Sequence, residues 1–414
     1  MRLATWLLVV VLAGCGSAGR MPDGVTIGAL LPLTGSLASY GESSKAALAE
    51  AVATINARRG PRLTLEIVDT RTDPAAALDA LKTLTGKGIT VVVGPYASSE
   101  VRMTKDAAAD RGVILISPLS TARSLAIADD NVFRFTPDDE QEAEAVAALA
   151  IADGVRVMLT VTRDDEGNQG LQAAFRPAFE KRGGRTLLGL VYRANETDFA
   201  GSVRILLRNV ARAQAANPGV GIGVYLTAFD EVVTFFNQLD AASSGNALTG
   251  ANTVLSGVKW YGSDSVAQSK ELVANAGAAA FALEAGYPNP IMGLDDRSRA
   301  TWGPVVERIA AKLGRTPDAF ALAAYDALMV GYDTLLKAGG GADLPARRRQ
   351  LTAVANAYDG LTGRTTLNAA GDRASGNYDF WAVCRMGNGF AWGKAAVYTN
   401  GEARRLSGCD QQPR

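Results

Sequence analysis

Apolar runs of strand length alternate with helical patterns along most of the chain. In the first third, apolar or β-branched residues form runs that read as buried strands, and each is followed by a segment with apolar residues at helical spacing. The predicted strands cover residues 25–31, 63–68, 89–93 and 113–116, and the predicted helices cover residues 43–57, 74–84 and 100–111. Nearly continuous apolar strands that alternate with helices are typical of a parallel sheet covered on both faces.

The same alternation begins again after Asp138. Here the predicted helices cover residues 143–152, 170–182, 203–215 and 231–239, and the predicted strands cover residues 156–161, 186–191, 223–226 and 258–261. Two long helices, 299–313 and 317–338, and two strands, 378–383 and 390–397, complete the pattern. A chain of 414 residues exceeds what one core usually holds. The sequence therefore predicts an α/β protein of two doubly wound, Rossmann-like lobes with a cleft between them.

Composition excludes several classes of chemistry. The chain has no histidine, which removes Ser-His-Asp and Cys-His catalysis and His-ligated metal sites. Basic and acidic residues balance at 42 each, and no Lys/Arg tract is dense enough for a nucleic-acid surface. The glycines at 219–223 precede a predicted strand instead of following one, which argues against a dinucleotide fingerprint. We expect no metal and no cofactor.

The N-terminus carries an export pattern. An arginine precedes the apolar run LATWLLVVVLAGC, which is too short to span a bilayer but suits a signal peptide. Residues 12–15, LAGC, resemble a bacterial lipobox, which implies cleavage before Cys15 and lipid attachment to it. We therefore expect a signal peptide over 1–14 and a lipidated tether over 15–23. The alternative is an ordinary signal peptide with an incidental cysteine.

If Cys15 carries lipid, two cysteines remain, Cys384 and Cys409. Exported proteins fold in an oxidising place, so this pair predicts one disulfide that ties the C-terminal tail to a late strand. Two free buried thiols are the alternative.

Serine and threonine follow two neighbouring strands where each strand ends. The run 89–93 leads through Gly94 and Pro95 to Ser98 and Ser99, ahead of a predicted helix, and the run 113–116 leads to Ser117, Ser120 and Thr121. Ligands of open parallel sheets bind beyond the carboxyl ends of the strands, and helix N-termini favour anions. Neither turn contains lysine or arginine, so a small carboxylate fits better than a phosphate chain. For any one serine, helix capping is the alternative.

An ordered set of short motifs resembles the type I periplasmic binding proteins, specifically the leucine/isoleucine/valine-binding group. The motifs are residues 28–35 with Tyr40-Gly41, 93–99, 116–121, 133–138, 260–264, and 358–363 with Gly371-Asp372. The resemblance implies two lobes joined by a three-segment hinge. Lobe 1 would comprise residues 24–139 and about 287–375, and lobe 2 residues 140–286 and about 376–414.

The resemblance also implies roles for individual residues. Ser98 and Thr121, with the backbone near Ser120, would hold a ligand α-carboxylate, and Tyr40 would line the cleft from lobe 1. Asp264 would bind the ligand ammonium, because a desolvated cation needs a paired anion. Without the family, an N-cap of the following helix is a comparable reading of Asp264.

Two positions in the second lobe leave the side-chain specificity open. Glu166 stands where the family usually has an aromatic residue before glycine. A glutamate there suggests a more polar ligand, with an extra amine or amide, or else a side chain that points to solvent. Phe229 falls near the place of a second cleft aromatic.

The function that these features predict is solute capture for an ABC importer. The protein would close on a small amino-acid-like ligand by hinge motion and present the closed form to a membrane permease. Its location would be periplasmic or at the cell surface, on a lipid anchor. A sensor on the same fold, reporting to a receptor or regulator, is the alternative, and an exported enzyme is a third reading with little support.

Overall fold

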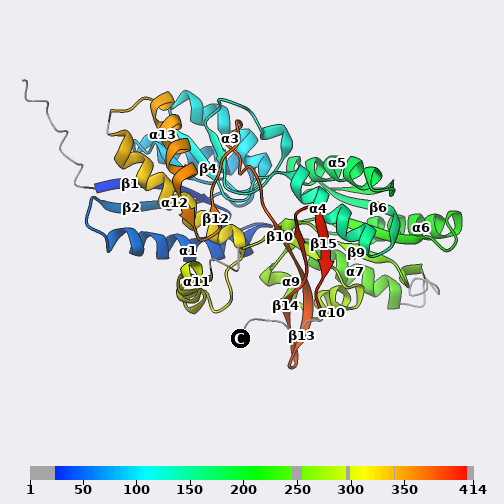
Figure 1. The fold of residues 1–414 in the computed structure, drawn as a ribbon. Coiled ribbons are helices and arrows are strands. Elements are labelled where there is room, and N and C mark those ends of the chain that lie inside the picture. The colour runs from blue at the N-terminus through cyan, green and yellow to red at the C-terminus, as the bar shows by residue number, and fades with distance from the viewer. Residues whose placement is uncertain (1–23, 245–253, 295–298, 340, 408–414) are drawn as a thin grey trace, which may run out of the picture.

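The computed structural model describes residues 24–244, 254–294, 299–339 and 341–407. Figure 1 shows two α/β lobes side by side, with the N-terminal strands in lobe 1 and the green central part of the chain in lobe 2. A separate antiparallel sheet from the C-terminal part of the chain packs against lobe 2. The predicted α/β class with two lobes is confirmed.

Lobe 1 is built on a five-stranded parallel sheet in the order β2-β1-β3-β4-β5. Its strands are β1 (Gly24–Leu31), β2 (Arg62–Asp69), β3 (Val91–Val93), β4 (Ile114–Ser117) and β5 (Val132–Arg134). The direction of chain progression reverses between β1 and β3. This reversal is the place where an open α/β sheet leaves room for a ligand beyond its strand ends.

Helices cover both faces of this sheet. One face packs under α2 (Pro74–Gly86) and α3 (Ser98–Asp110), and the other packs under α1 (Ala38–Asn56) and α12 (Ala319–Ala338). Around these lie α11 (Arg299–Leu313) against α1, and α13 (Leu344–Ala357) against α12. By length and hydropathy α12 would suffice to cross a membrane, but most of it is buried, so here it is the core helix of lobe 1.

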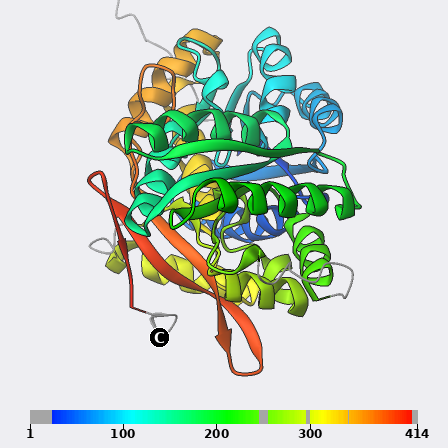
Figure 2. The same ribbon diagram turned by 90° about the vertical axis from the view of Figure 1, so that its right-hand side faces the viewer.

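Lobe 2 repeats the design on a four-stranded parallel sheet in the order β7-β6-β8-β9. The strands are β6 (Val155–Asp164), β7 (Arg185–Arg193), β8 (Gly221–Thr227) and β9 (Lys259–Tyr261). The helices of this lobe are α4 (Asp139–Ala152), α5 (Glu166–Lys181), α6 (Ala200–Ala216), α7 (Val232–Ser244), α9 (Lys270–Ala274) and α10 (Ala276–Ala285). In the view of Figure 2, lobe 2 faces the reader. Separate apolar clusters on its two faces show that this sheet is also buried from both sides.

The antiparallel sheet has the order β10-β13-β14-β15 and packs against α4 and α10. Its strands are β10 (Asn289–Met292), β13 (Tyr378–Met386), β14 (Gly389–Thr399) and β15 (Glu402–Arg405), and a short hairpin joins β11 (Asp359–Gly360) to β12 (Gly363–Arg364). The chain thus passes between the lobes after β5, after β10 and after β12.

A buried ion pair joins the first and third of these passages. The guanidinium of Arg134 donates from Nε and Nη2 to the two carboxylate oxygens of Asp372, each at 2.6 Å, and from Nη1 to the carbonyl of Ala122 at 2.7 Å. Both side chains are 1% exposed. The backbone follows the same path, because Arg134 N–H donates to Gly371 O and Arg373 N–H to Arg134 O.

Several helices begin earlier in the chain than predicted. The predicted helix over 43–57 begins at Ala38, and the one over 143–152 begins at Asp139. Polar and small residues fill these first turns and interrupt the apolar pattern, although α4 carries the acidic first turn that the helix dipole favours. The predicted helix over 299–313 is confirmed in its bounds, and Asp73 caps α2 by accepting from Ala76 N–H.

The three cysteines are described only in part. Cys384 lies on β13 and is disulfide-bonded. Its predicted partner, Cys409, and the predicted lipidation site, Cys15, lie outside the described residues. The Cys384–Cys409 pairing, the signal peptide and the lipid anchor therefore stay predictions.

Candidate functional site

A small cavity lies between the carboxyl ends of the lobe 1 strands and the facing elements of lobe 2. Its volume is about 20 Å³, roughly the space of one or two water molecules. With the lobes in this position, a ligand of amino-acid size enters only if they move apart. The lining residues are Ala97, Ser98, Leu119, Thr121, Gly167, Asn168, Leu171, Phe229, Asp264 and Ser265.

Lobe 1 contributes hydroxyl groups to this cavity. Ser98, the first residue of α3, accepts the N–H of Ala122 at 3.2 Å and shares a hydrogen bond with the hydroxyl of Ser120 at 3.0 Å. No side chain caps α3 at its N-cap residue, Ala97, so the capping reading of Ser98 is wrong. Thr121 lines the cavity beside Ser98. The structure therefore brings the predicted hydroxyls of two successive strand ends together.

Glycine 167 keeps this place accessible from lobe 2. A Cβ atom added at Gly167 would lie 3.4 Å from the Ser98 hydroxyl oxygen, so a larger residue would crowd it. Asn168, the next residue of α5, is held by the N-cap carboxylate Asp165, which accepts from both its backbone and its amide. Sequence reasoning passed over Gly167 and Asn168 because an N-cap pattern alone does not reveal what the helix faces.

Asp264 faces the hydroxyls from lobe 2. It follows β9 as the first residue of a 3-10 turn, where the N-cap position is Ser263, so it is not the cap of that turn. Its carboxylate accepts from the hydroxyl of Ser265 at 2.8 Å and is 4% exposed. Burial raises the pKa of the Asp264 carboxyl to about 6, against an ordinary value of 3.8. A ligand ammonium would reverse the effect of burial by pairing with the ionised form.

Phe229 forms the apolar wall predicted for lobe 2. The Arg163 guanidinium lies 4.6 Å from the centre of its ring. Arg163 itself is buried and pairs with Asp165 at 2.6 Å and Glu231 at 3.0 Å. Because its charge is already neutralised twice, Arg163 serves to fix the ring and not to attract an anion into the cavity.

Tyr40 bridges the lobes and does not line the cavity. Its hydroxyl donates to the carbonyl of Ala267 at 2.8 Å, with the carbonyl of Asp264 at 3.2 Å. Ser39 and Asp230 make a similar contact nearby, at 3.3 Å between hydroxyl and carboxylate. The prediction that Tyr40 lines the cleft is therefore wrong for this cavity, because its hydroxyl is used in a lobe-to-lobe hydrogen bond next to Asp264.

Glu166 and Ser99 do not line the cavity either. The Glu166 carboxylate crosses to lobe 1, where it pairs with Arg102 at 2.5 Å and accepts from the hydroxyl of Ser124. The hydrogen bond from Arg102 lowers the pKa of Glu166. The glutamate in the aromatic position of the family therefore ties the cleft rim together. Ser99 lies one residue beyond Ser98 on α3 and is only partly buried.

Two carboxyl groups that sequence reasoning missed lie behind Asp264. Asp139 and Glu142 occupy adjacent turns on one face of α4, and both are fully buried. Burial raises the pKa of Asp139 to about 8 and that of Glu142 well above 4.5, and the charge of Asp264 acts in the same direction on both. From sequence these residues look like the ordinary acidic first turn of a helix.

These groups predict how stability depends on pH. A carboxyl whose folded-state pKa is raised keeps its proton after the unfolded chain has released one, so folding is favoured at low pH and loses that advantage as pH rises. The groups around them are Asp138, Arg134, Tyr225 and Tyr378. We expect the free energy of unfolding of the ligand-free protein to fall between about pH 5 and about pH 8, the range that contains the pKa values of about 6 and about 8.

Urea titrations at the two ends of that range measure this effect. Carboxyls with lowered pKa values, such as Glu50 and Asp69, act the other way but only below about pH 4.5, so they do not mask it. Equal stability at both ends would contradict the burial of these groups in the protonated form.

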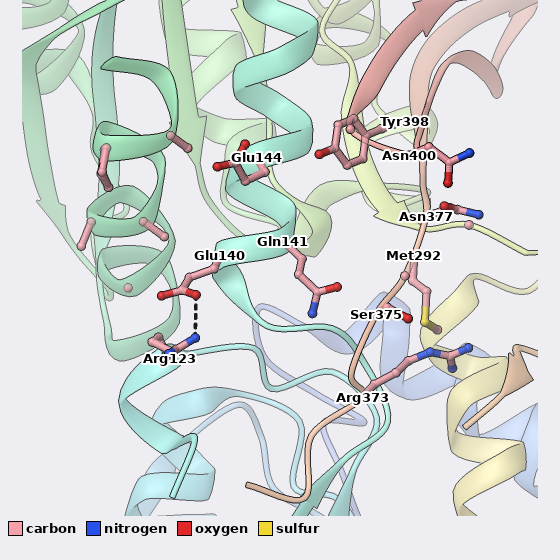
Figure 3. Close-up of a pocket in the computed structure, with 18 of the residues that line it drawn as sticks. Arg123, Glu140, Gln141, Glu144, Met292, Arg373, Ser375, Asn377, Tyr398 and Asn400 are labelled. Carbon is pink, nitrogen blue, oxygen red and sulfur yellow. Dashed lines mark hydrogen bonds and ion pairs between the residues drawn. The ribbon is translucent and has the colours of Figure 1, made fainter. Parts of the chain in front are cut away.

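A larger cavity of about 1360 Å³ lies on the hinge side of the molecule. Figure 3 shows that Glu140, Gln141 and Glu144 of α4 face it across from Arg373 and Asn377 of the third passage. Arg123 and Glu140 form an ion pair at its edge, at 2.6 Å. Of the predicted ligand residues only Glu166 lines it, so the predicted site corresponds to the small interlobe cavity.

Comparison with other proteins agrees with this arrangement. An uncharacterised protein of Methanocaldococcus jannaschii is 28% identical, over 91% of this chain and 93% of that protein. The Leu/Ile/Val-binding protein BraC3 of Rhizobium johnstonii is also 28% identical, over 47% of this chain and 54% of its own length. The chain thus spans about half the length of that relative.

Solved structures show the same fold at lower identity. A leucine-binding protein, LivK, of Thermotoga maritima superposes with a TM-score of 0.69 at 19% identity, over 91% of this chain and 99% of its own. A solute-binding protein of an ABC transporter from R. palustris, in complex with benzoate, gives 0.70 at 20% identity, over 92% and 95%. The sequence model described as "Periplasmic binding protein" matches residues 24–386. The chain therefore belongs to the periplasmic binding protein family.

Proposed function

We propose that this protein is the extracytoplasmic binding component of an ABC importer and captures a small amino-acid-like solute between its lobes. One observation carries the proposal: Ser98 and Thr121 of lobe 1 and Asp264 of lobe 2 line the same cavity. Neutral donors on one side suit a carboxylate, and a buried acid on the other suits an ammonium. The relatives whose names state a ligand are binding proteins, which supports a binding role over catalysis.

Closure of the lobes would couple binding to delivery. Ligand groups that contact both lobes stabilise the closed form, and a permease that recognises only this form then receives loaded protein. The lipid anchor predicted at Cys15 would hold the protein near that permease.

A thermal-shift screen tests the ligand class. The full chain is refolded to strip any bound solute and then scanned with α-amino acids, small amides, polyamines and carboxylates that lack an amine, including benzoate. A ligand at a hundred times its dissociation constant stabilises the protein by about 2.7 kcal/mol, which is a shift of several degrees. Stabilisation by amine-free carboxylates alone would overturn the ammonium role of Asp264.

Ser98→Ala tests the carboxylate site. The substitution leaves one oxygen of a bound carboxylate without its donor, so we expect binding of the best α-amino acid of the screen to weaken by about 1–3 kcal/mol. Isothermal titration calorimetry measures the change. Ser99→Ala is the matched control, because Ser99 is adjacent in sequence but does not line the cavity. Equal affinities of the Ser98→Ala variant and the wild type would remove Ser98 from the site.

A further inference from the structure

Three carboxyl groups lie together at the lobe 2 end of the interlobe cavity. Asp264 lines the cavity, and Asp139 and Glu142 lie behind it on α4. They are 4%, 0% and 1% exposed. The backbone N–H of Asp264 donates to Glu142 Oε1 at 3.1 Å, which links α4 directly to the cavity wall. Asp139 connects to the other end of the site, because its N–H donates to the carbonyl of Thr121 at 3.0 Å.

Much of the hydrogen-bonding capacity of this group is unused. Neither oxygen of Asp139 has a hydrogen-bond partner of ordinary geometry, although the Thr121 hydroxyl is near enough to lower its pKa. Oε2 of Glu142 has none of ordinary geometry either, although the Asp264 carboxyl is near enough to share a proton with Glu142, which raises the pKa of Glu142. Buried polar atoms in folded proteins are nearly always paired, and an isolated buried charge costs several kcal/mol. Unpaired acceptors of this kind therefore point to a donor that arrives from outside.

A neutral side chain beside the carboxyl groups is also unpaired. The hydroxyl of Tyr225 on β8 is fully buried without a partner, and the charges of Glu142, Asp264 and Asp139 all raise its pKa, which places it among them. Residues of α4 and β8 thus place unpaired polar atoms close together.

No cation on the protein is available to neutralise these acids within the described part of the chain. The guanidinium that acts on Asp139 is Arg134, and each of its three nitrogens already donates to another group, two to the Asp372 carboxylate and one to the carbonyl of Ala122. A ligand with a neutral aliphatic side chain in this place would leave the carboxyl groups unpaired. A ligand with one ammonium would satisfy Asp264 and still leave Asp139 and Glu142.

We propose that Asp139 and Glu142 form a second cation subsite, and that the ligand is an amino-carboxylate carrying a second protonated nitrogen. This inference rests on the proposed function, since it takes Ser98 and Thr121 for the carboxylate and Asp264 for the α-ammonium. The second nitrogen donates to Asp139 and to Glu142 Oε2, next to the Tyr225 hydroxyl. A metal ion fits less well, because the described residues include no group of acids that converges for metal ligation.

Pairs of ligands that differ only in the second charge test this inference. The full chain is titrated by calorimetry with L-ornithine against L-norvaline, with L-lysine against L-norleucine, and with L-arginine against L-citrulline. We expect the charged member of at least one pair to bind a hundredfold or more tightly than its neutral partner, because a site of buried polar groups strongly rejects an analogue that leaves them unpaired. Titration in two buffers of different ionisation enthalpy should also show protons released on binding, as the carboxyls ionise.

Two variants assign the preference to the subsite. Glu142→Gln and Asp139→Asn should each reduce the preference for the charged partner at least tenfold and reduce proton release, while binding of the neutral partner persists. Glu140→Gln is the matched control, since Glu140 lies on the same helix but lines the larger cavity on the hinge side, where it pairs with Arg123 (Figure 3). It should keep the wild-type preference.

The outcomes separate this inference from the function on which it rests. Tight binding of the neutral amino acids, with no gain from the second charge, would keep the proposed function and overturn the second subsite. A charge preference that survives both variants would also overturn it. Binding of no amino acid of either kind would overturn the proposed function together with the subsite.

Discussion

Arg134→Met is expected to lower the free energy of unfolding by about 3–5 kcal/mol, the usual cost of leaving one partner of a buried ion pair alone. Arg134 is bound to both oxygens of Asp372 at 2.6 Å, and both side chains are 1% exposed. Methionine fills a similar space but provides no charge, so Asp372 would remain buried without a countercharge, and the Ala122 carbonyl would lose its donor. Urea unfolding measured with the wild type in parallel gives the difference.

Two further variants separate the charge effect from packing. The double variant Arg134→Met with Asp372→Leu removes both charges and should recover much of the lost stability, because replacing a whole buried pair is often close to neutral. Arg364→Met breaks an exposed pair with Asp359 and should cost at most about 1 kcal/mol. A small cost for Arg134→Met alone would mean that this pair does not hold the two passages together.

Asp264→Asn is expected to weaken binding of an α-amino acid by about 2–5 kcal/mol, the range found when one member of a buried charge pair is truncated. Asparagine has nearly the same shape, so Ser265 and Phe229 keep their places in the wall. What is lost is the negative charge opposite the ligand ammonium. Calorimetry with the best α-amino acid of the screen and with its deaminated analogue measures the loss and its origin.

The deaminated analogue makes the result specific. It has no ammonium, so Asp264→Asn should leave its affinity unchanged or raise it. The preference for the amino acid over its deaminated analogue should therefore shrink by at least the factor by which the affinity for the amino acid falls. Glu271→Gln, at an exposed acid of α9 in the same lobe, is the control and should bind as the wild type does. An equal loss of affinity for both ligands would assign Asp264 to folding of the site instead of to the ammonium.

The alternation of apolar runs and helical patterns predicted the two lobes because parallel strands are apolar throughout, and that signal is local. The third sheet was only half predicted. Its strands β13 and β14 have apolar runs, whereas β10 is four residues with a proline. The assignment of β10 depends on pairing with β13, which is far along the chain, as in the pair of Asn289 and Trp381. The helix α13 was passed over because its arginines look like a solvated surface.

The position of Ser98 and Thr121 at the cavity could be expected because serine and threonine follow strand ends, whereas Asp264 was expected only from the resemblance to the family. The site was not predictable where the partner comes from another lobe. Glu166 was expected to face the ligand or solvent, but the position of Arg102 decides its direction, and no spacing in the sequence reveals that contact. Asp139 and Glu142 are hidden for a similar reason, because only the packing of α4 against the 3-10 turn at Asp264 buries them.

The contacts that join the lobes do not involve a solute. Tyr40 to Ala267, Glu166 to Arg102, and Glu42 to Lys270 at 3.1 Å are made by the protein with itself. They set the fraction of ligand-free protein whose lobes are already closed. Because a solute enters only the open form, its apparent dissociation constant rises with that fraction. Each kcal/mol by which these contacts favour the shut form changes the population ratio about fivefold. Rim residues that do not line the small cavity thus tune the solute concentration that half-saturates the protein.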